Sequence, residues 1–366
     1  MVVGGGVIGL SIAWRAAGRG MTVTVADPAF EGAASGVAAG MLAPVTEVHY
    51  GEEALLELNL ESSRRYPAFV AELEEATGQG TGYRPSGTVT VARDADDLAA
   101  LDELVAYQRS LGLDVERLRS RELRRLEPAL APGVRGGALV PGDHQVDPRR
   151  LVDTLVQGCR GRGVTLRPEQ VEEIGDGSVV LGGGDEESAD AVVVAAGCWS
   201  NEIQGLAPDG VAVRPVKGQI LRLRGPAGRP LAGHNVRGLD AYLVFRDDGE
   251  VVVGATVEER GYDLTVTGGA VHDLLRAALE LVPDVAELTL VETATGLRPG
   301  TSDNAPLIGP GGADRVVLAT GHYRNGILLA PVTADSVAEL LATGDVPAVI
   351  APFSPHRFDR PRRVAS

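Results

Sequence analysis

The chain has 366 residues, and its 44% hydrophobic and 23% charged residues are ordinary for a globular protein, which argues against extensive disorder. Its formal net charge of −16 argues against a nucleic-acid partner, because binding to phosphates requires clustered Lys and Arg. The length predicts about two domains.

The composition also favours a cytoplasmic protein. Two cysteines, Cys159 and Cys198, are too few for a disulfide framework or a metal cluster. The apolar start over 2–17 lacks a basic leader and is interrupted by glycines, and we find no apolar run of the roughly 18 residues that a membrane-spanning helix needs. We therefore expect neither export nor a membrane segment.

The first 27 residues predict a βαβ unit. A strand at 2–3 leads into a glycine turn, a helix reaching Gly20 and a strand over 22–26. The turn has the spacing GxGxxG, which brings the backbone close to a pyrophosphate at the N-terminus of a helix. Asp27 follows at the distance expected of an acidic residue that binds a ribose hydroxyl. The unit predicts a dinucleotide site and does not separate FAD from NAD.

Residues 32–140 alternate between helical and strand patterns. The small residues over 32–44 would let a flat ring or a phosphate approach the backbone. The apolar spacing over 52–77 predicts helices, the alternation over 83–92 predicts a strand, and 94–125 predicts amphipathic helices. We expect 82–140 to be an insertion into the first domain.

The sequence of the second half predicts strands of two sheets, one parallel and one antiparallel. The apolar run over 191–196 is typical of a buried parallel strand. Short strands at 220–223, 241–245 and 251–255 predict an antiparallel sheet, and a strand at 315–320 with a helix at 332–343 returns to the first domain.

These elements predict an α/β fold with an α+β second domain. A Rossmann-like FAD-binding or NAD-binding domain is assembled from discontinuous segments, and a substrate-binding domain carries an antiparallel sheet and helices. We place the first domain at residues 1–81, 142–214 and 291–366. The second domain then takes residues 82–141 and 215–290.

Five segments resemble the D-amino-acid-oxidase-like FAD-dependent oxidoreductases, and within them the glycine-oxidising branch. They are the glycine turn, the small-residue stretch over 32–44, RPVKGQ at 214–219, TGLRP at 295–299 and GHYRNGI at 321–327. The resemblance runs from residue 2 to about 340 and implies FAD as cofactor. Related sarcosine oxidases attach FAD through a cysteine near the C-terminus, and no cysteine follows Cys198, so we expect non-covalent FAD.

The resemblance also implies the site residues. Those expected to contact FAD are Gly4, Gly6, Val7, Ile8, Gly9, Asp27, Ser35, Ala38, Ala39, Gly40, Met41, Val171, Ala196, Gly197, Tyr323, Arg324, Asn325, Gly326, Ile327 and Leu328. Those expected to contact the substrate are Arg298 as a bidentate carboxylate clamp, Tyr242 through its hydroxyl, Met41, Val257 and Arg324. At Val257, next to the strand over 253–256, the resemblance implies a bulkier thioether side chain in glycine oxidases. This difference leaves the size of the substrate open.

No catalytic acid, base or metal ligand is expected. Hydride transfer to a flavin requires position and electrostatics from the protein, while the cofactor carries the chemistry. We interpret Lys217, the one lysine of the chain, as part of a crossover between domains in preference to a cation that assists oxygen reduction.

The function implied is oxidative deamination of glycine, with sarcosine and small D-amino acids as further substrates and O2 reduced to hydrogen peroxide. The imine product would supply the thiazole moiety of thiamine, with a thiazole synthase as recipient. Two alternatives stay open: a D-amino-acid dehydrogenase or sarcosine-oxidase-like flavoenzyme of the same fold, and a nucleotide-binding protein without turnover. The sequence also leaves open whether the chain forms a homo-oligomer.

Overall fold

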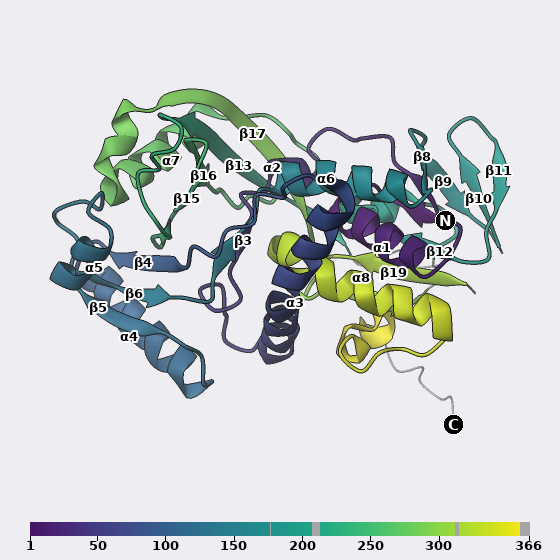
Figure 1. Cartoon of the computed structure of the whole chain (residues 1–366), viewed down its shortest axis with the longest axis horizontal. Coiled ribbons are helices and arrows are strands. Elements are labelled where there is room, and N and C mark those ends of the chain that lie inside the picture. Colours follow the sequence, from purple (N-terminus) through teal and green to yellow (C-terminus); the bar gives the residue numbers. More distant parts are fainter. Residues whose placement is uncertain (176, 207–212, 312–314, 359–366) are drawn as a thin grey trace.

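The computed structural model describes residues 1–175, 177–206, 213–311 and 315–358. Two large sheets lie side by side, with helices packed against both (Figure 1). The chain passes between the two sheets several times, so each sheet is built from segments that are distant in sequence. This arrangement confirms the predicted fold class.

A six-stranded sheet carries the glycine turn. Its order is β18 (Leu307–Pro310), β19 (Val316–Thr320), β12 (Val192–Val194), β1 (Val2–Val3), β2 (Thr24–Ala26) and β8 (Thr165–Arg167). All neighbouring strands are parallel except β18, which runs antiparallel to β19. The predicted βαβ unit is thus confirmed at the centre of this sheet.

Successive valines of the parallel strands point to opposite faces of the sheet. Val2 and Val193 join the core under the helices α1 (Val7–Gly18), α3 (Glu53–Thr77), α6 (Pro148–Gly161) and α8 (Gly326–Thr343). Val3 and Val194 pack on the other face against the antiparallel strands β9 (Val171–Ile174), β10 (Ser178–Leu181) and β11 (Glu186–Ser188). Burial on both faces explains the continuous apolar run.

The eight-stranded sheet forms the other half. Its order is β17 (Thr289–Gly300), β13 (Arg214–Arg224), β16 (Glu250–Gly254), β15 (Tyr242–Phe245), β14 (Asn235–Arg237), β4 (Thr88–Ala92), β6 (Gly136–Val140) and β5 (Glu116–Arg119). Its pairs are antiparallel except β14 with β4. The helices α4 (Ala95–Ser110), α5 (Ser120–Leu126) and α7 (Gly268–Leu281) pack on it.

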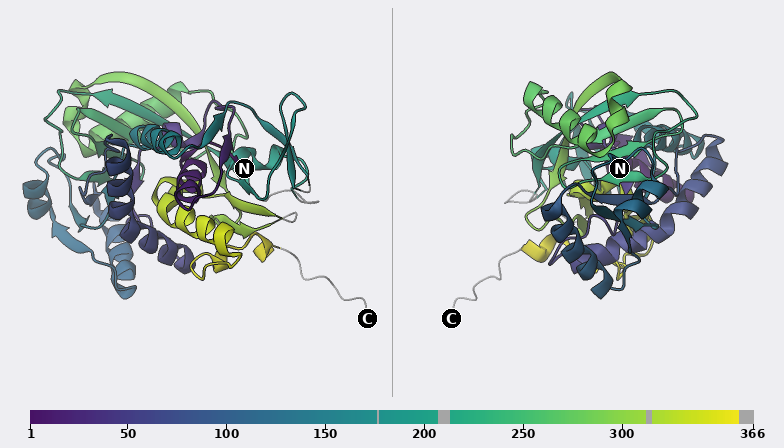
Figure 2. Two further views of the ribbon diagram at one scale, coloured as in Figure 1. Left: turned by 45° about the vertical axis from the view of Figure 1, so that its right-hand side comes forward. Right: turned by 90° about the vertical axis from the view of Figure 1, so that its left-hand side faces the viewer.

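The remaining elements are short. They are α2 (Ala34–Val37), the paired strands β3 (Met41–Leu42) and β7 (His144–Gln145), and 3-10 turns at Gly197–Glu202, Pro283–Glu287, Tyr323–Asn325, Ala351–Phe353 and Pro355–Phe358. Two views of the ribbon show the helices and strands of both halves meeting along one seam (Figure 2).

Two sequence-based expectations differ from the structure, and one long strand was not predicted. The helices expected over 52–77 are one helix, α3, which ends at Gly78 in the left-handed conformation. The stretch 94–125 contains a strand, β5, because a short charged edge strand lacks the apolar alternation that reveals a strand. Residues 289–300 form β17, which hydrogen-bonds along β13. The domain boundaries themselves stay a prediction.

By length and composition alone, Tyr323–Thr343 could cross a membrane, which the sequence analysis did not expect. Two thirds of its most apolar window, 67%, is buried inside the protein. There α8 packs against α1 and α3, as the yellow helix beside them in Figure 1 shows.

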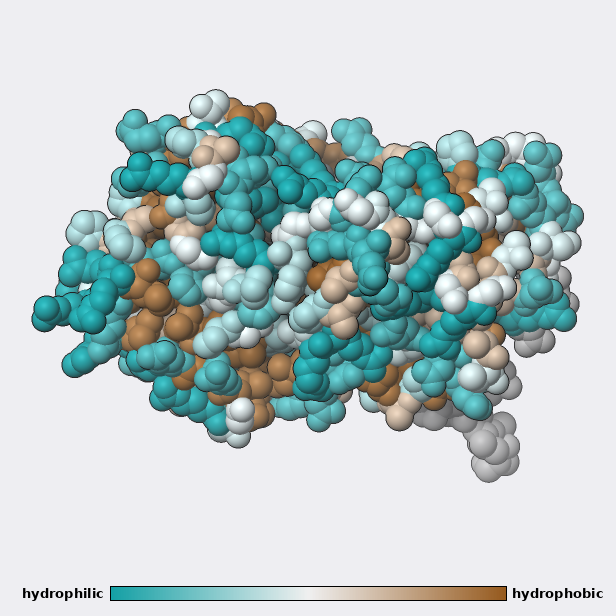
Figure 3. Space-filling view, viewed as in Figure 1, coloured by the Kyte–Doolittle hydropathy of each residue, from teal (hydrophilic) through white to brown (hydrophobic). Residues whose placement is uncertain are grey.

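The face in Figure 3 is largely hydrophilic, and its apolar side chains gather mainly at the lower left, near α4 and β6.

Candidate active site

A large cavity lies between the two sheets. The six-stranded sheet contributes the glycine turn and the start of α8, and the eight-stranded sheet contributes β13, β15, β16 and β17. Every residue expected to contact FAD or substrate lines this cavity except Gly9, Asn325 and Leu328. The fold therefore gathers segments from across the chain into one site.

The end of the cavity at α1 fits a dinucleotide. A Cβ at Gly4 would collide with the carbonyl of Ala195, so only glycine allows this turn. Gly6, Val7 and Ile8 at the N-terminus of α1 line the cavity, and Val7 N donates to Ser35 Oγ at 3.0 Å. Asp27 accepts hydrogen bonds from the backbone amides of Gly5 and Ala29, which fixes its carboxylate beside the turn.

Three expected FAD contacts lie behind the cavity wall. A Cβ at Gly9 would overlap the carbonyl of Gly4, so this glycine permits close packing of helix on strand and does not line the site. Leu328 belongs to the apolar core, and its carbonyl accepts from Ser62 Oγ at 2.6 Å. Asn325 is 7% exposed and ends the turn before α8.

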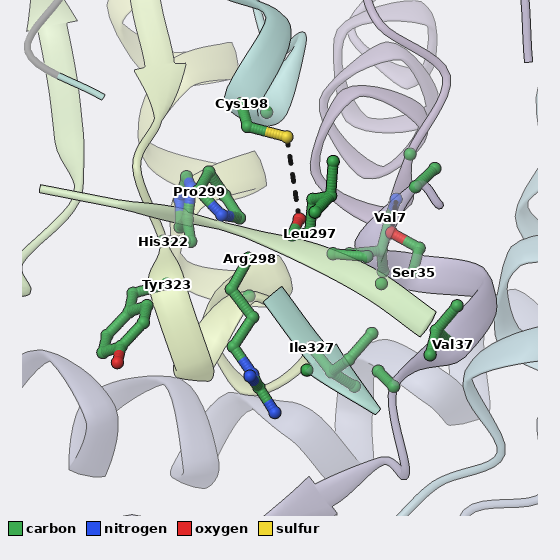
Figure 4. A pocket seen from close by; sticks show the side chains of 18 of the residues that line it. Val7, Ser35, Val37, Cys198, Leu297, Arg298, Pro299, His322, Tyr323 and Ile327 are labelled. Atoms are coloured by element: carbon green, nitrogen blue, oxygen red, sulfur yellow. Dashed lines mark hydrogen bonds between the residues drawn. The ribbon is translucent and has the colours of Figure 1, made fainter. Parts of the chain in front are cut away.

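Arg298 enters the other end of the cavity from β17. Figure 4 shows its side chain extending between Tyr323 and Ile327. Its Nη1 donates to the carbonyls of Thr256 at 3.1 Å and Lys217 at 3.4 Å. Among the described residues no carboxylate pairs with it, so its charge is available to an anionic ligand.

Tyr242 stands beside Arg298. Its ring covers Gly254 of the neighbouring strand, where a side chain would overlap it. Burial raises the pKa of Tyr242, and the nearby charge of Arg298 only partly opposes this. The hydroxyl therefore stays protonated at neutral pH and can donate to a carboxylate held by Arg298.

The remaining expected substrate contacts lie at different depths. Met41 in β3 and Arg324 line the cavity, and Nη2 of Arg324 lies 3.8 Å from the carboxylate of Glu52. Val257 lies at the rim, because β16 ends at Gly254 and leaves Val257 63% exposed on the following loop. Val257 nevertheless lines the cavity, and its contact with the substrate stays a prediction.

A charged pair in the wall was missed from the sequence. Glu47 and Arg237 both line the cavity, and Glu47 Oε1 accepts from Arg237 Nη1 at 2.7 Å. Burial pushes the pKa of Glu47 upward, but the charges of Arg237 and Arg324 prevail and lower it. Glu47 follows the small-residue stretch closely enough to have been suspected, whereas no local pattern marks Arg237.

His322 also lines the cavity and was not assigned a role. It is 3% exposed, and its Nε2 lies 3.1 Å from Thr333 Oγ1. Burial lowers the pKa of His322 to about 3, so the ring is neutral at physiological pH. Within the described ranges, no group of three or more His, Cys, Asp or Glu is arranged to hold a metal ion.

Comparison with known proteins defines the class. The family model described as "FAD dependent oxidoreductase" matches residues 1–340, so the chain belongs to this DAO family and is an FAD-dependent oxidoreductase. The cavity described above, with its glycine turn, the N-terminus of α1 and Asp27, has the features that the sequence predicts for a dinucleotide site.

Relatives within this family include proteins named glycine oxidase. The chain is 33% identical to the glycine oxidase of Geobacillus kaustophilus over 96% of this chain and 95% of that protein. The crystal structure of a glycine oxidase from the same species matches with a TM-score of 0.89 over 97% of each chain. The bifunctional protein ThiO/ThiG of Synechocystis is 38% identical over 98% of this chain, which spans about half, 54%, of that relative.

Proposed function

We propose that this enzyme oxidises glycine to its imine and passes the electrons to O2, which yields hydrogen peroxide. The observation that carries the proposal is the pair Arg298 and Tyr242: an arginine without a carboxylate partner and a protonated hydroxyl, side by side in the FAD cavity. A small amino acid supplies the carboxylate that this pair can bind. Relatives named glycine oxidase support the choice of substrate.

The protein residues act by binding and orientation. Arg298 binds the substrate carboxylate and Tyr242 donates to the same group. These two contacts orient the substrate so that its Cα–H bond points into the cavity. FAD, when bound, supplies the hydride acceptor. We assign no general acid or base, because a neutral amine with an aligned Cα–H needs none.

The same site accepts close analogues of glycine. Sarcosine and small D-amino acids keep the carboxylate that Arg298 binds, and one added carbon in an apolar pocket changes selectivity by only about 1 to 3 kcal/mol. Val257 lines the cavity and is 63% exposed at its rim.

We also propose that the flavin is held without a covalent bond. Cys198 lines the cavity, but burial raises the pKa of its thiol to about 12 and its Sγ donates to the carbonyl of Leu297. Such a thiol is a poor nucleophile. Acid precipitation should therefore release all of the flavin into the supernatant.

The imine product fits a role in thiamine synthesis in the cytoplasm, with a thiazole synthase as recipient. Support comes from the Synechocystis relative, which carries two functions, ThiO and ThiG, in one chain.

The test is to purify the protein, record its visible spectrum and add glycine with and without oxygen. Bleaching of the flavin without oxygen, and peroxide formation with it, are expected. Bleaching without peroxide or oxygen consumption would instead favour a dehydrogenase of the same fold. A yellow protein that glycine does not bleach would overturn the proposed substrate.

A further inference from the structure

A loop between β16 and α7 borders the cavity that we assign to FAD. We call residues 255–266 the strap. Ala255 and Val257 line the cavity at its substrate end. At the other end, a side chain at Gly32 would overlap Leu264, so the strap lies directly on the loop that follows β2. The strap therefore spans both halves of the protein.

Tyr262 anchors the strap to the FAD side. Its hydroxyl lies within hydrogen-bonding distance of two acceptors, the carbonyl of Cys198 at 2.9 Å and Glu202 Oε1 at 3.2 Å. Its ring lies 6.2 Å from that of Trp199, which in turn stacks on Phe30 at 4.8 Å. Cys198, Trp199, Glu202 and Phe30 all line the cavity, so the strap braces its wall.

Lys217 holds the strap from the sheet side. It is fully buried, and its Nζ donates to Asp263 Oδ2 at 2.7 Å. Its backbone exchanges two hydrogen bonds with Glu258, at 2.9 and 3.0 Å. The next residue, Gly218, lines the cavity, whereas Lys217 is not among the residues that line it, as alternation along a strand requires. The ammonium group therefore serves the strap and does not face the flavin.

The strap also fixes the carboxylate clamp. Arg298 Nη1 donates to the carbonyls of Thr256, in the strap, and of Lys217 itself. A shift of the strap would remove one of these acceptors and let the guanidinium turn.

We propose that Lys217 is a positioning residue whose ion pair with Asp263 keeps the strap closed over the FAD cavity and Arg298 in place. It governs the affinity for FAD and for substrate while contacting neither. A buried cation pays a large desolvation cost unless it is paired, so Lys217 and Asp263 act as one unit.

The experiment compares Lys217→Met with the unaltered protein. Titration of apoprotein with FAD, followed by flavin fluorescence, should show a dissociation constant about 10-fold to 100-fold higher, the range for loss of one charged hydrogen bond. Trypsin should cut faster after the exposed Arg260 of the strap, because an open strap is accessible to the protease. Neither measurement depends on the substrate, so both stand apart from the proposed glycine oxidation.

Kinetics with saturating FAD separate this role from a direct one. The KM for the amine substrate should rise, while kcat and the rate of reoxidation of reduced flavin by O2 stay within about twofold of the starting values. Unchanged FAD affinity and trypsin cleavage, together with slower reoxidation, would overturn the proposal in favour of a cation that assists oxygen reduction.

Controls test the ion pair itself. Lys217→Arg keeps the charge and should recover most of the FAD affinity. Asp263→Asn, at the more exposed end of the pair, should reproduce the loss and supplies the same readouts if Lys217→Met does not fold. Arg276→Met removes an exposed pair with Glu280 on α7 and should change neither FAD affinity nor cleavage. Loss of FAD affinity in Arg276→Met equal to that in Lys217→Met would contradict a specific role for Lys217.

Discussion

The guanidinium of Arg298 lies directly over the backbone of Gly218 on the adjacent strand, where a Cβ would stand 2.5 Å from its Cζ. The guanidinium that we propose as the carboxylate clamp thus occupies the space that a side chain at residue 218 would need. The proposed clamp therefore requires both Arg298 in β17 and a glycine at residue 218 in β13.

Gly218→Ala should displace Arg298 and impair substrate binding. We expect kcat/KM for glycine to fall at least about 10-fold, mainly through KM, because the added methyl group forces the guanidinium from its position. Gly80→Ala is the matched control, since a Cβ there meets no atom within 4 Å. Equal kcat/KM for the two variants would show that Arg298 can move without loss.

Arg298→Ala should remove one charge-assisted bidentate contact, about 2 to 4 kcal/mol. Steady-state kinetics should then show a loss of about 30-fold to several-hundred-fold in kcat/KM for glycine. Arg298→Lys should recover only part of it, since an ammonium cannot bind a carboxylate in bidentate geometry. Arg64→Ala, at an exposed arginine, serves as control. An unchanged kcat/KM in Arg298→Ala would refute the role of Arg298 as the carboxylate clamp.

Arg246 should stabilise the junction between the sheets. It is 6% exposed, and its guanidinium bonds to Glu250 at 3.0 Å and to the carbonyls of Ala39 at 2.7 Å and Val146 at 3.1 Å. Arg246→Met removes the donor of both carbonyls and leaves Glu250 with Arg222 as its buried partner, so it should lower the free energy of unfolding by about 3 to 5 kcal/mol. Chemical denaturation measures this against Arg276→Met, which should cost less than about 1 kcal/mol. Similar losses in both would argue against the role.

His322 should make the protein less stable in acid. Its folded pKa, about 3, lies below the ordinary value of 6.5, so the unfolded chain binds a proton first as the pH falls. Stability due to this group is complete above pH 6.5 and declines by about 1.4 kcal/mol per pH unit until the folded pKa is reached. Thermal unfolding of the protein and of His322→Gln across this range should show a shallower slope for the variant. Parallel slopes would mean that His322 is protonated in the fold.

The first 27 residues could be interpreted correctly because their signals are local. The glycine spacing, the helix and Asp27 lie within one βαβ unit, and the structure places them as expected. Gly9 shows the limit of such reasoning. A glycine that permits helix–strand packing and a glycine that contacts FAD look the same in the sequence, and the structure gives Gly9 the packing role.

Strands that depend on their neighbours could not be recognised. β5 is a charged edge strand, and β17 mixes threonine, glycine and proline with few apolar residues. Both form because β6 and β13 offer hydrogen bonds along their length, which is a tertiary effect that overrides local propensity.

The sequence by itself determined the α/β fold and the FAD-dependent family, and it predicted the glycine turn and Arg298 as site features, because short motifs carry these signals. Only the tertiary structure decided which side chains meet: Glu47 with Arg237 across 190 residues, and Lys217 with Asp263 across 46. These contacts depend on how the two sheets pack and on the register of β14 and β13, where a change of one residue would turn Arg237 or Lys217 to the opposite face.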